Sequence, residues 1–191
     1  PAKCQHAYET QVISPSTATE EGTAKYICQI CGDYYEGSLP TQMKILSIGD
    51  SYSSDSTKYL YQMLSDAGTE NVTVANLVLD GGLDDVLEDD SGAYLKNADG
   101  KWRESDTSVL EALADEEWDV ITLQQSGKTE SYKNLQNVLE FINKNSEKSE
   151  IFWNMNWASS KQTYSEIVNV VKTEVASKEL IGGIIPTGTA L

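Results

Sequence analysis

The chain has 191 residues, enough for one medium-sized domain or for one domain with a small additional module. Its 30 acidic and 14 basic residues give a net charge of −16, which disfavours binding to nucleic acid or to anionic membranes. No apolar run approaches the ~20 residues that span a bilayer, so membrane insertion is not expected. Because the chain begins with Pro1 and shows no signal peptide, we expect a mature product or an excised segment.

Residues 1–40 are rich in Thr, Glu, Tyr and Gly and poor in aliphatic residues, which predicts short strands and turns. A segment of this length cannot bury enough apolar surface to fold without a staple, that is, a disulfide or a bound metal ion. It contains every cysteine and the only histidine of the chain, at Cys4, His6, Cys28 and Cys31. This C-x-H and C-x-x-C-G pattern predicts a small module with a closed structural zinc site, which leaves no coordination position for a substrate. The alternative is a disulfide between Cys28 and Cys31, or between Cys4 and Cys28, with the third thiol free.

The segment places a series of residues in a fixed order: Cys4, His6, Tyr8, Pro15, Thr19-Glu20-Glu21-Gly22, Tyr26 and Cys28-x-x-Cys31-Gly32-Asp33. In this order it resembles a small Cys/His repeat module, similar to a zinc ribbon, of secreted or surface proteins of Gram-positive gut bacteria. It differs in lacking a cysteine after Pro15, where many copies have one. The resemblance implies a structural or adhesive module, outside the cell, without chemistry of its own.

From Met43 onward, apolar runs alternate with helical patterns. Strands are predicted in MKILSIGDS, VTVANLVLDGG, WDVITLQQ, EIFWNMNW and GGIIPTGTAL, whose mostly apolar character indicates burial on both faces. Apolar residues recur at helical spacing in 55–67, 105–116, 132–142 and 164–175. Residues 41–191 are therefore predicted to form an α/β domain, a flavodoxin-like three-layer sandwich with a parallel five-stranded sheet. The polar stretch 83–104 is expected to be a loop or an insertion near the site.

The first of these strands ends in Gly49-Asp50-Ser51 and is followed by a helix. In an open α/β sheet ligands bind at the carboxyl ends of the strands, so Ser51 is a candidate nucleophile, held near a helix N-terminus. A turn followed by a helix cap would give the same tripeptide without catalysis. A phosphate or nucleotide site at this turn is disfavoured, because Asp50 and Asp55 would repel phosphate.

The stretches ILSIGDSYSSD, NLVLDGG, WDVITLQQSG, IFWNMNWA and IIPTGTA follow one another along the chain. In this order they resemble the motifs of GDSL/SGNH-type serine hydrolases, closest to a bacterial branch without a well-assigned substrate, over residues 44–191. The resemblance implies that Ser51 is the nucleophile and that the backbone amides of Ser51 and Gly82 donate to the oxyanion. Where the family has a third donor, an asparagine, this chain has Gln124 and Gln125, of which Gln125 is the first candidate.

The residues expected to line the substrate site are Asp50, Asn154 and Trp157, whereas Trp153 is expected to pack in the core. The family's catalytic Asp and His come as D-x-x-H after the fifth strand, but this chain ends at Leu191 before such a motif. His6 is taken up by the cysteines. We therefore expect a C-terminally truncated hydrolase that is nearly inactive, because a serine without a base cannot lose its proton near pH 7.

These features lead us to expect a bacterial esterase or deacetylase, secreted or at the cell surface, that removes a small acyl group from a glycan. Its partner would be an acylated small molecule or glycan, and its catalysis would need no cofactor beside the structural zinc of the module. The glycan and the location outside the cell rest on the resemblances alone. The alternative is a carbohydrate-binding or surface-display protein without catalytic activity.

Overall fold

A computed structural model describes residues 4–126, 129–159 and 162–189 of the chain. The chain divides into two compact units, one of Pro1–Met43 with Met63–Val72 and one of Lys44–Gln62 with Thr73–Leu191. The first unit is built on an antiparallel three-stranded sheet, in which β2 (Gly22–Cys28) lies between β1 (Tyr8–Ser14) and β3 (Tyr34–Leu39). The β-rich module expected at the N-terminus is therefore present.

Aromatic rings, and not aliphatic side chains, pack on this small sheet. Tyr26 and Tyr35 are opposite each other in the strand register and stack with their ring centroids 4.8 Å apart. Tyr8 meets Tyr35 edge-on at 5.1 Å. Among the described residues of the three strands, Ala24 and Cys28 are the only buried hydrophobic ones. The sheet thus lacks an aliphatic core, as expected for a segment that needs a staple.

The second unit is built on a mixed sheet that has seven strands in the described part of the chain, in the order β10-β9-β8-β4-β5-β6-β7. Along the chain they are β4 (Gln42–Gly49), β5 (Asn71–Val78), β6 (Ser91–Asn97), β7 (Arg103–Ser108), β8 (Val120–Leu123), β9 (Glu150–Asn154) and β10 (Ile181–Ile185). Strands β10, β9, β8 and β4 pair in parallel. The five predicted strands are all present, and their order along the sheet, 2-1-3-4-5, is the flavodoxin-like one. The predicted α/β class is confirmed.

The sheet has two strands more than the sequence predicted. The stretch 83–104, expected to be a loop or an insertion, contains β6 and the start of β7, which form an antiparallel hairpin beside β5. Strand β7 reads RESDTS and has no buried residue, so it gives no apolar signal. Polar and charged residues are typical of an edge strand, where they oppose pairing with other chains.

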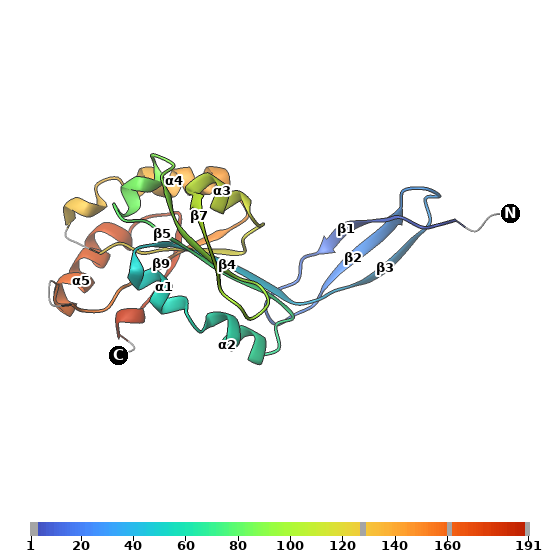
Figure 1. Cartoon of the computed structure of the whole chain (residues 1–191), viewed down its shortest axis with the longest axis horizontal. Helices are drawn as coiled ribbons and strands as arrows, with labels where there is room; N and C mark the ends of the chain where they lie inside the picture. Colours follow the sequence, from blue (N-terminus) through green and yellow to red (C-terminus); the bar gives the residue numbers. More distant parts are fainter. Residues whose placement is uncertain (1–3, 127–128, 160–161, 190–191) are drawn as a thin grey trace. The chain divides into compact units, whose positions relative to one another are not determined.

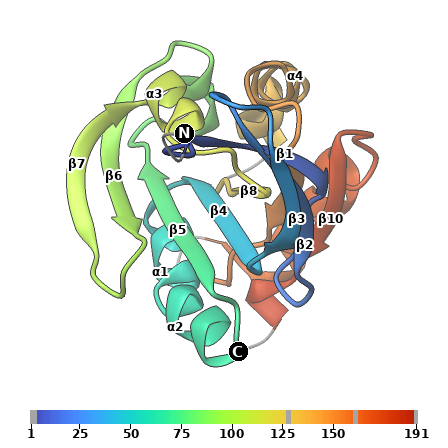
Figure 2. The same cartoon turned by 90° about the vertical axis from the view of Figure 1, so that its right-hand side faces the viewer.

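In the ranges that the structure describes, five short α-helices connect the strands: α1 (Ser51–Thr57), α2 (Leu60–Asp66), α3 (Val109–Ala114), α4 (Leu135–Asn145) and α5 (Tyr164–Val170), which continues into a π-helical turn, Val171–Val175. Single 3₁₀ turns lie at Leu83–Val86, Thr129–Tyr132 and Thr187–Thr189. Figures 1 and 2 show α3 and α4 on one face of the sheet and α1 on the other. Within the described residues, none of the helices has the length and apolar character that crossing a membrane requires.

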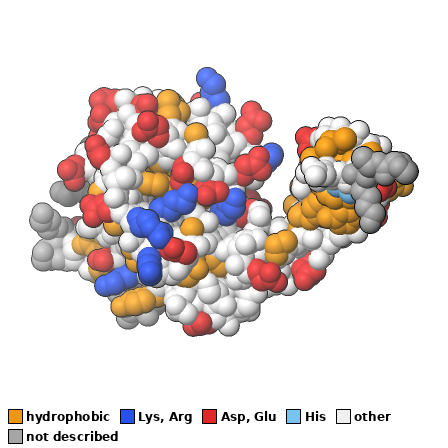
Figure 3. Space-filling view, turned by 45° about the vertical axis from the view of Figure 1, so that its right-hand side comes forward, with side chains coloured by type: hydrophobic (Ala, Val, Ile, Leu, Met, Phe, Trp, Pro, Cys, Tyr) orange, Lys and Arg blue, Asp and Glu red, His pale blue; other side chains and the backbone are white. Residues whose placement is uncertain are grey.

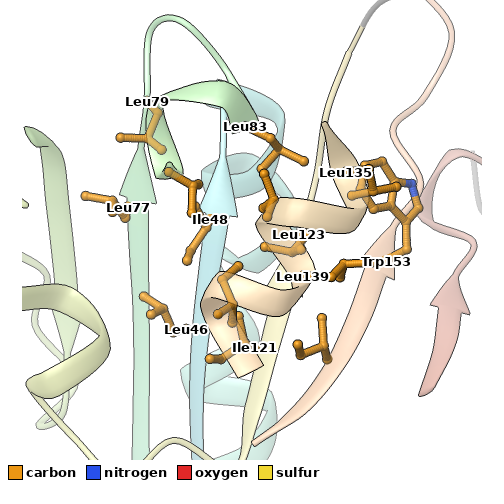
Figure 4. Close-up of a cluster of buried hydrophobic side chains, with 14 of the residues drawn as sticks. Leu46, Ile48, Leu77, Leu79, Leu83, Ile121, Leu123, Leu135, Leu139 and Trp153 are labelled. Atoms are coloured by element: carbon orange, nitrogen blue, oxygen red, sulfur yellow. The ribbon is translucent and has the colours of Figure 1, made fainter. Parts of the chain in front are cut away.

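The hydrophobic core lies on the α4 face of the sheet. Figure 4 shows Ile48, Leu123 and Trp153 from three neighbouring strands facing Leu135 and Leu139 of α4. Trp153 has an exposed fraction of 0%, which confirms its expected place in the core. Helix α1 adds nothing to this cluster, because its buried residues are a serine and a threonine.

Charged side chains are distributed over the second unit, and Figure 3 shows acidic residues beside a group of Lys and Arg on the face in view. One ion-pair network joins three elements of this unit. Lys96 of β6 lies 2.7 Å from Asp115 and 2.8 Å from Glu116, which follow α3, and Lys44 of β4 lies 2.9 Å from Glu116. The network ties the amino-terminal end of β4 to the β6–β7 hairpin.

Candidate functional site

The candidate site lies at the carboxyl ends of β4 and β8. The chain leaves β4 for β5 on one side and returns to β8 on the other, so the connections diverge between these two parallel neighbours. In open α/β sheets a crevice for ligands forms at this point. The structure places Ser51 at the end of β4 and Gln124 and Gln125 at the end of β8.

Ser51 is the first residue of α1 and is exposed. Asp50 precedes it as the helix cap, and its Oδ1 accepts a hydrogen bond from the backbone N–H of Tyr52 at 2.9 Å. The other carboxylate oxygen accepts a hydrogen bond from the Ser126 hydroxyl at 2.7 Å. Asp50, expected to line the substrate site, thus connects the turn of Ser51 with the segment after β8.

Gly82 and Gln125 are in direct contact. Gly82 has φ +87°, a conformation that side-chain-bearing residues rarely adopt. A Cβ on Gly82 would lie 2.7 Å from Oε1 and 2.9 Å from Nε2 of Gln125. The amide of Gln125 is fixed at both ends: Oε1 accepts from the N–H of Leu83 at 2.8 Å, and Nε2 donates to the carbonyl of Ser126 at 2.8 Å. A primary amide has two N–H bonds, so among the described residues one hydrogen on Nε2 has no partner and can bind a ligand.

Gln124 has a different environment from Gln125. It is 1% exposed, and its Oε1 accepts from the backbone N–H of Asp50 at 3.1 Å. Its side chain also lies against Gly49, where a Cβ would come within 2.8 Å of Oε1. Gln124 therefore contacts and supports the end of β4, and Gln125 is the amide that faces Gly82.

Two residues of this site, Ser126 and Tyr132, were not predicted as site residues from the sequence. Ser126 binds Asp50, as described above, and the hydroxyl of the buried Tyr132 donates to the carbonyl of Gln125 at 2.7 Å. Burial raises the pKa of Tyr132, and the charge of Asp50 raises it further, so this hydroxyl stays a donor. Their only signal in the sequence is a position close to the predicted glutamines.

The structure places Asn154 and Trp157 around α1. Asn154 is only 4% exposed, and both polar atoms of its side chain bind other residues: Nδ2 donates to Ser56 Oγ and Oδ1 accepts from Thr187 Oγ1, each at 2.6 Å. Trp157 is half-buried and meets the Tyr52 ring edge-on at 4.8 Å. Trp157 therefore lies beside the first turn of α1.

In the first unit the four predicted ligands form one cluster. The ligand atoms of Cys4, His6, Cys28 and Cys31 all lie within 4.8 Å of one another, so the cluster could hold a metal ion. Cys4 Sγ is 4.0 Å from Cys28 Sγ, and Cys31 Sγ is 3.5 Å from His6 Nδ1. The three thiols are free in this structure.

The turn 28–32 shapes this cluster. The backbone N–H of Ile30 points at Cys28 Sγ at 3.4 Å, and Gly32, with φ +75°, donates to the Cys28 carbonyl at 2.9 Å. Burial acts to raise the pKa of the Cys28 thiol, but backbone N–H groups, that of Cys31 first, outweigh it and lower the pKa to about 6. A hydrogen bond with Cys31, together with burial, raises the pKa of Cys4 to about 12. A thiolate favoured at Cys28 suits metal binding, since the thiolate is the form that ligates.

The second unit is thus an α/β protein of flavodoxin-like topology with a polar site around an exposed serine at the switch point. Residues 44–191 match the family described as "Domain of unknown function (DUF4886)", and the chain belongs to this family. It is similar to a DUF4886 family protein from Bacteroides uniformis ATCC 8492, whose crystal structure was determined at 1.50 Å resolution. The two are 28% identical with a TM-score of 0.68, over 78% of this chain and 68% of that one. A comparison with curated proteins found no match.

Proposed function

We propose that the α/β unit is a serine hydrolase of the SGNH type, an esterase or deacetylase that removes an acyl group from a glycan. The observation that carries the proposal is an exposed Ser51 after β4, with Gly82 and Gln125, which contact each other, following the two strands that neighbour β4 in the sheet. A nucleophile beside fixed N–H donors is the arrangement that acyl transfer requires. The resemblance of the motifs to SGNH hydrolases supports the same assignment.

In the proposed reaction, Ser51 Oγ attacks the carbonyl carbon of the ester and its proton passes to a general base. The negative charge that develops on the carbonyl oxygen is stabilised by the backbone N–H groups of Ser51 and Gly82 and by Nε2 of Gln125. The C–O bond to the sugar then breaks, and the base returns the proton to the leaving alkoxide. Water releases the acyl group from Ser51 in a second passage through the same steps.

Residues 44–191 contain no histidine that could act as the general base. His6 belongs to the metal cluster of the other unit, where its Nδ1 is 3.5 Å from Cys31 Sγ. The SGNH resemblance assigns the base to the histidine of a D-x-x-H motif, which residues 44–191 do not contain. Without it, the residues of this chain bind and polarise the ester but take up no proton from Ser51.

A fluorophosphonate probe tests the nucleophile. We expect labelling of the protein extended by its natural residues beyond Leu191, and loss of labelling in Ser51→Ala. Ser54→Ala is the matched control, because Ser54 is on the same helix and its hydroxyl donates to the Ser51 carbonyl. Equal labelling of the extended protein and its Ser51→Ala variant, or no labelling of either, would refute the assignment of Ser51 as the nucleophile. If the extended protein takes up no label and does not hydrolyse p-nitrophenyl acetate, a carbohydrate-binding protein is favoured.

We further propose that the cluster in the first unit is a structural zinc site. In a tetrahedral site with Zn–S of about 2.3 Å and Zn–N of about 2.05 Å, two sulfurs lie about 3.8 Å apart and a sulfur and a nitrogen about 3.6 Å apart. The distances of 4.0 Å and 3.5 Å in the cluster are close to both values. Metal analysis after reducing purification without chelators is expected to find one zinc per chain, whereas a Cys28–Cys31 disulfide would give none.

A further inference from the structure

Helix α1, which begins at the proposed nucleophile, has no buried apolar side chain. Its sequence is SYSSDST, and its buried residues are Ser53 and Thr57. The positions that follow the core residues Ile48, Leu123 and Trp153 alternate to the α1 face of the sheet, and they are occupied by a glycine, a glutamine and an asparagine. A helix normally owes its place to a buried apolar stripe. In α1, hydrogen bonds such as that of Thr57 Oγ1 with Asn76 Oδ1 therefore take a larger part in fixing the position, beside the contact of Tyr52 with Trp157.

One such contact is a chain of three side chains that crosses from α1 to the end of β10. Asn154 Nδ2 donates to Ser56 Oγ of α1 at 2.6 Å, and Ser56 Oγ in turn donates to the Ser53 carbonyl at 2.8 Å. On its other side, Asn154 Oδ1 accepts from Thr187 Oγ1 at 2.6 Å. Each polar atom of the amide thus has a partner of the right kind.

The segment that carries Thr187 is itself held firmly against the end of β9. Met155 N–H donates to the Ile185 carbonyl and Gly188 N–H donates to the Met155 carbonyl, both at 2.9 Å. A Cβ on Gly188 would lie 2.1 Å from the Asn156 carbonyl oxygen, so the backbones approach closely. The backbone around Thr187 is therefore held in place, and the Thr187 hydroxyl can orient the amide of Asn154.

We propose that Asn154 is a positioning residue: it sets the place of α1, and through it that of Ser51, by joining Ser56 to Thr187. Its meaning for catalysis rests on the proposed function of Ser51, but the mechanical link is independent of it. In this proposal Asn154 acts through its bonds within the protein, because it is 4% exposed and both polar atoms of its side chain have partners there. The link also couples the nucleophile helix to the segment that leads out of β10.

Two substitutions of Thr187 separate the hydroxyl from the packing. Thr187→Val keeps the shape and removes the donor, whereas Thr187→Ser keeps the donor and loses a methyl group. In hydrogen–deuterium exchange of the peptide 51–58, we expect Thr187→Val to raise the exchange rate about tenfold and Thr187→Ser to restore it nearly to that of the unaltered chain. The reverse order, or no change in either variant, would overturn the proposal.

Asn154→Ala is expected to give the same local increase at α1. The matched control is Asn97→Ala, since Asn97 is also buried, at 3% exposure, but binds the N–H of Gly100 at the far end of the β6–β7 hairpin. Exchange at 51–58 should not change in this control. An increase of equal size in both variants would show that loss of any buried asparagine loosens the unit, and would overturn the assignment.

The fluorophosphonate labelling of Ser51 then distinguishes the two proposals. In the protein extended beyond Leu191, we expect Thr187→Val to slow labelling about tenfold and Thr187→Ser to rescue it. If Ser51 does not label in any variant but exchange at α1 follows the expected order, the positioning role stands and the hydrolase function fails. If labelling is normal in Thr187→Val although exchange at α1 rises, Asn154 does not position the nucleophile.

Discussion

Gly82 is the residue at which backbone conformation and side-chain space both require glycine. At φ +87° an L-residue is strained, and a Cβ would lie within 3 Å of both polar atoms of the Gln125 amide. We predict that Gly82→Ala lowers the free energy of unfolding by about 2–4 kcal/mol, from backbone strain and from displacement of that amide. Urea denaturation followed by Trp fluorescence measures this loss.

Gly100→Ala is the control that separates the two causes. Gly100 has φ +86°, but the nearest atom to its Cβ would be in the Tyr61 ring at 3.8 Å, so only the strain is introduced. We expect it to lower the free energy of unfolding by about 1–2 kcal/mol. In the protein extended beyond Leu191, only Gly82→Ala should slow the labelling of Ser51. Equal effects of the two substitutions on both measurements would show that the Gln125 amide is not part of the site.

For single residues, the sequence predicts which of them lie at the ends of strands, but it does not predict their hydrogen bonds. Ser51, Gly82 and Gln125 follow three predicted strands, and parallel strands bring these ends to one edge. The bonds of Asp50 to Ser126 and of Asn154 to Ser56 join residues 76 and 98 positions apart. They depend on side-chain directions across the sheet, which no local pattern encodes. For this reason Asn154 was expected at the substrate, whereas the structure places it inside.

Among the elements, the helix after β4 differs most from its prediction. One helix was predicted over 55–67, but the structure has α1 (Ser51–Thr57) and α2 (Leu60–Asp66). The apolar periodicity that suggested the helix lies in α2, whereas α1 has serines and threonines on its buried side. Helices α3, α4 and α5 were predicted more closely, because each buries an apolar face against the core.

The network of Lys96 with Asp115 and Glu116 predicts how the stability of the α/β unit depends on pH. Burial acts to raise the pKa of both carboxyl groups, but the hydrogen bonds from Lys96 outweigh it and hold each pKa below its ordinary value, 3.8 for Asp115 and 4.5 for Glu116. Carboxyl groups with a lowered pKa stabilise the folded state above their unfolded pKa, and the contribution is lost as the pH falls through the folded pKa.

We therefore predict that Lys96→Met lowers the free energy of unfolding by about 1 kcal/mol at pH 7, and that the difference from the unaltered chain shrinks as the pH falls below the ordinary pKa values of the two carboxyl groups. Urea denaturation at several pH values measures it. Lys148→Met is the control, because the ion pair of Lys148 with Glu117 is highly exposed and should contribute little. A difference for Lys96→Met that does not shrink at acidic pH would mean that packing of the lysine stem, and not its charge, is responsible.

The whole molecule combines two ways of stabilising a fold. The α/β unit buries a continuous hydrophobic cluster, whereas the N-terminal sheet has stacked tyrosines and the Cys/His cluster. The change of composition near residue 40 predicts this contrast, because a segment with few aliphatic residues needs a staple. The hairpin β6–β7 could not be predicted in the same way, since an edge strand made of polar residues resembles a loop in sequence.

With the proposed zinc site, this contrast predicts that a chelator unfolds the N-terminal sheet and leaves the α/β unit folded. All four tryptophans, Trp102, Trp118, Trp153 and Trp157, lie in the α/β unit, so their fluorescence follows that unit by itself, whereas the N-terminal sheet contributes Tyr8, Tyr26, Tyr34 and Tyr35. Structural zinc sites supply about 10 kcal/mol or more of folding free energy, so removal of the zinc should melt a sheet without an aliphatic core.

We expect a strong zinc chelator, and likewise Cys31→Ser, to abolish the near-ultraviolet circular dichroism of the stacked tyrosines and to expose residues 4–39 to protease. The thermal transition detected by tryptophan should persist. An intact, protease-resistant N-terminal sheet after removal of the metal would show that the tyrosine stack alone holds it.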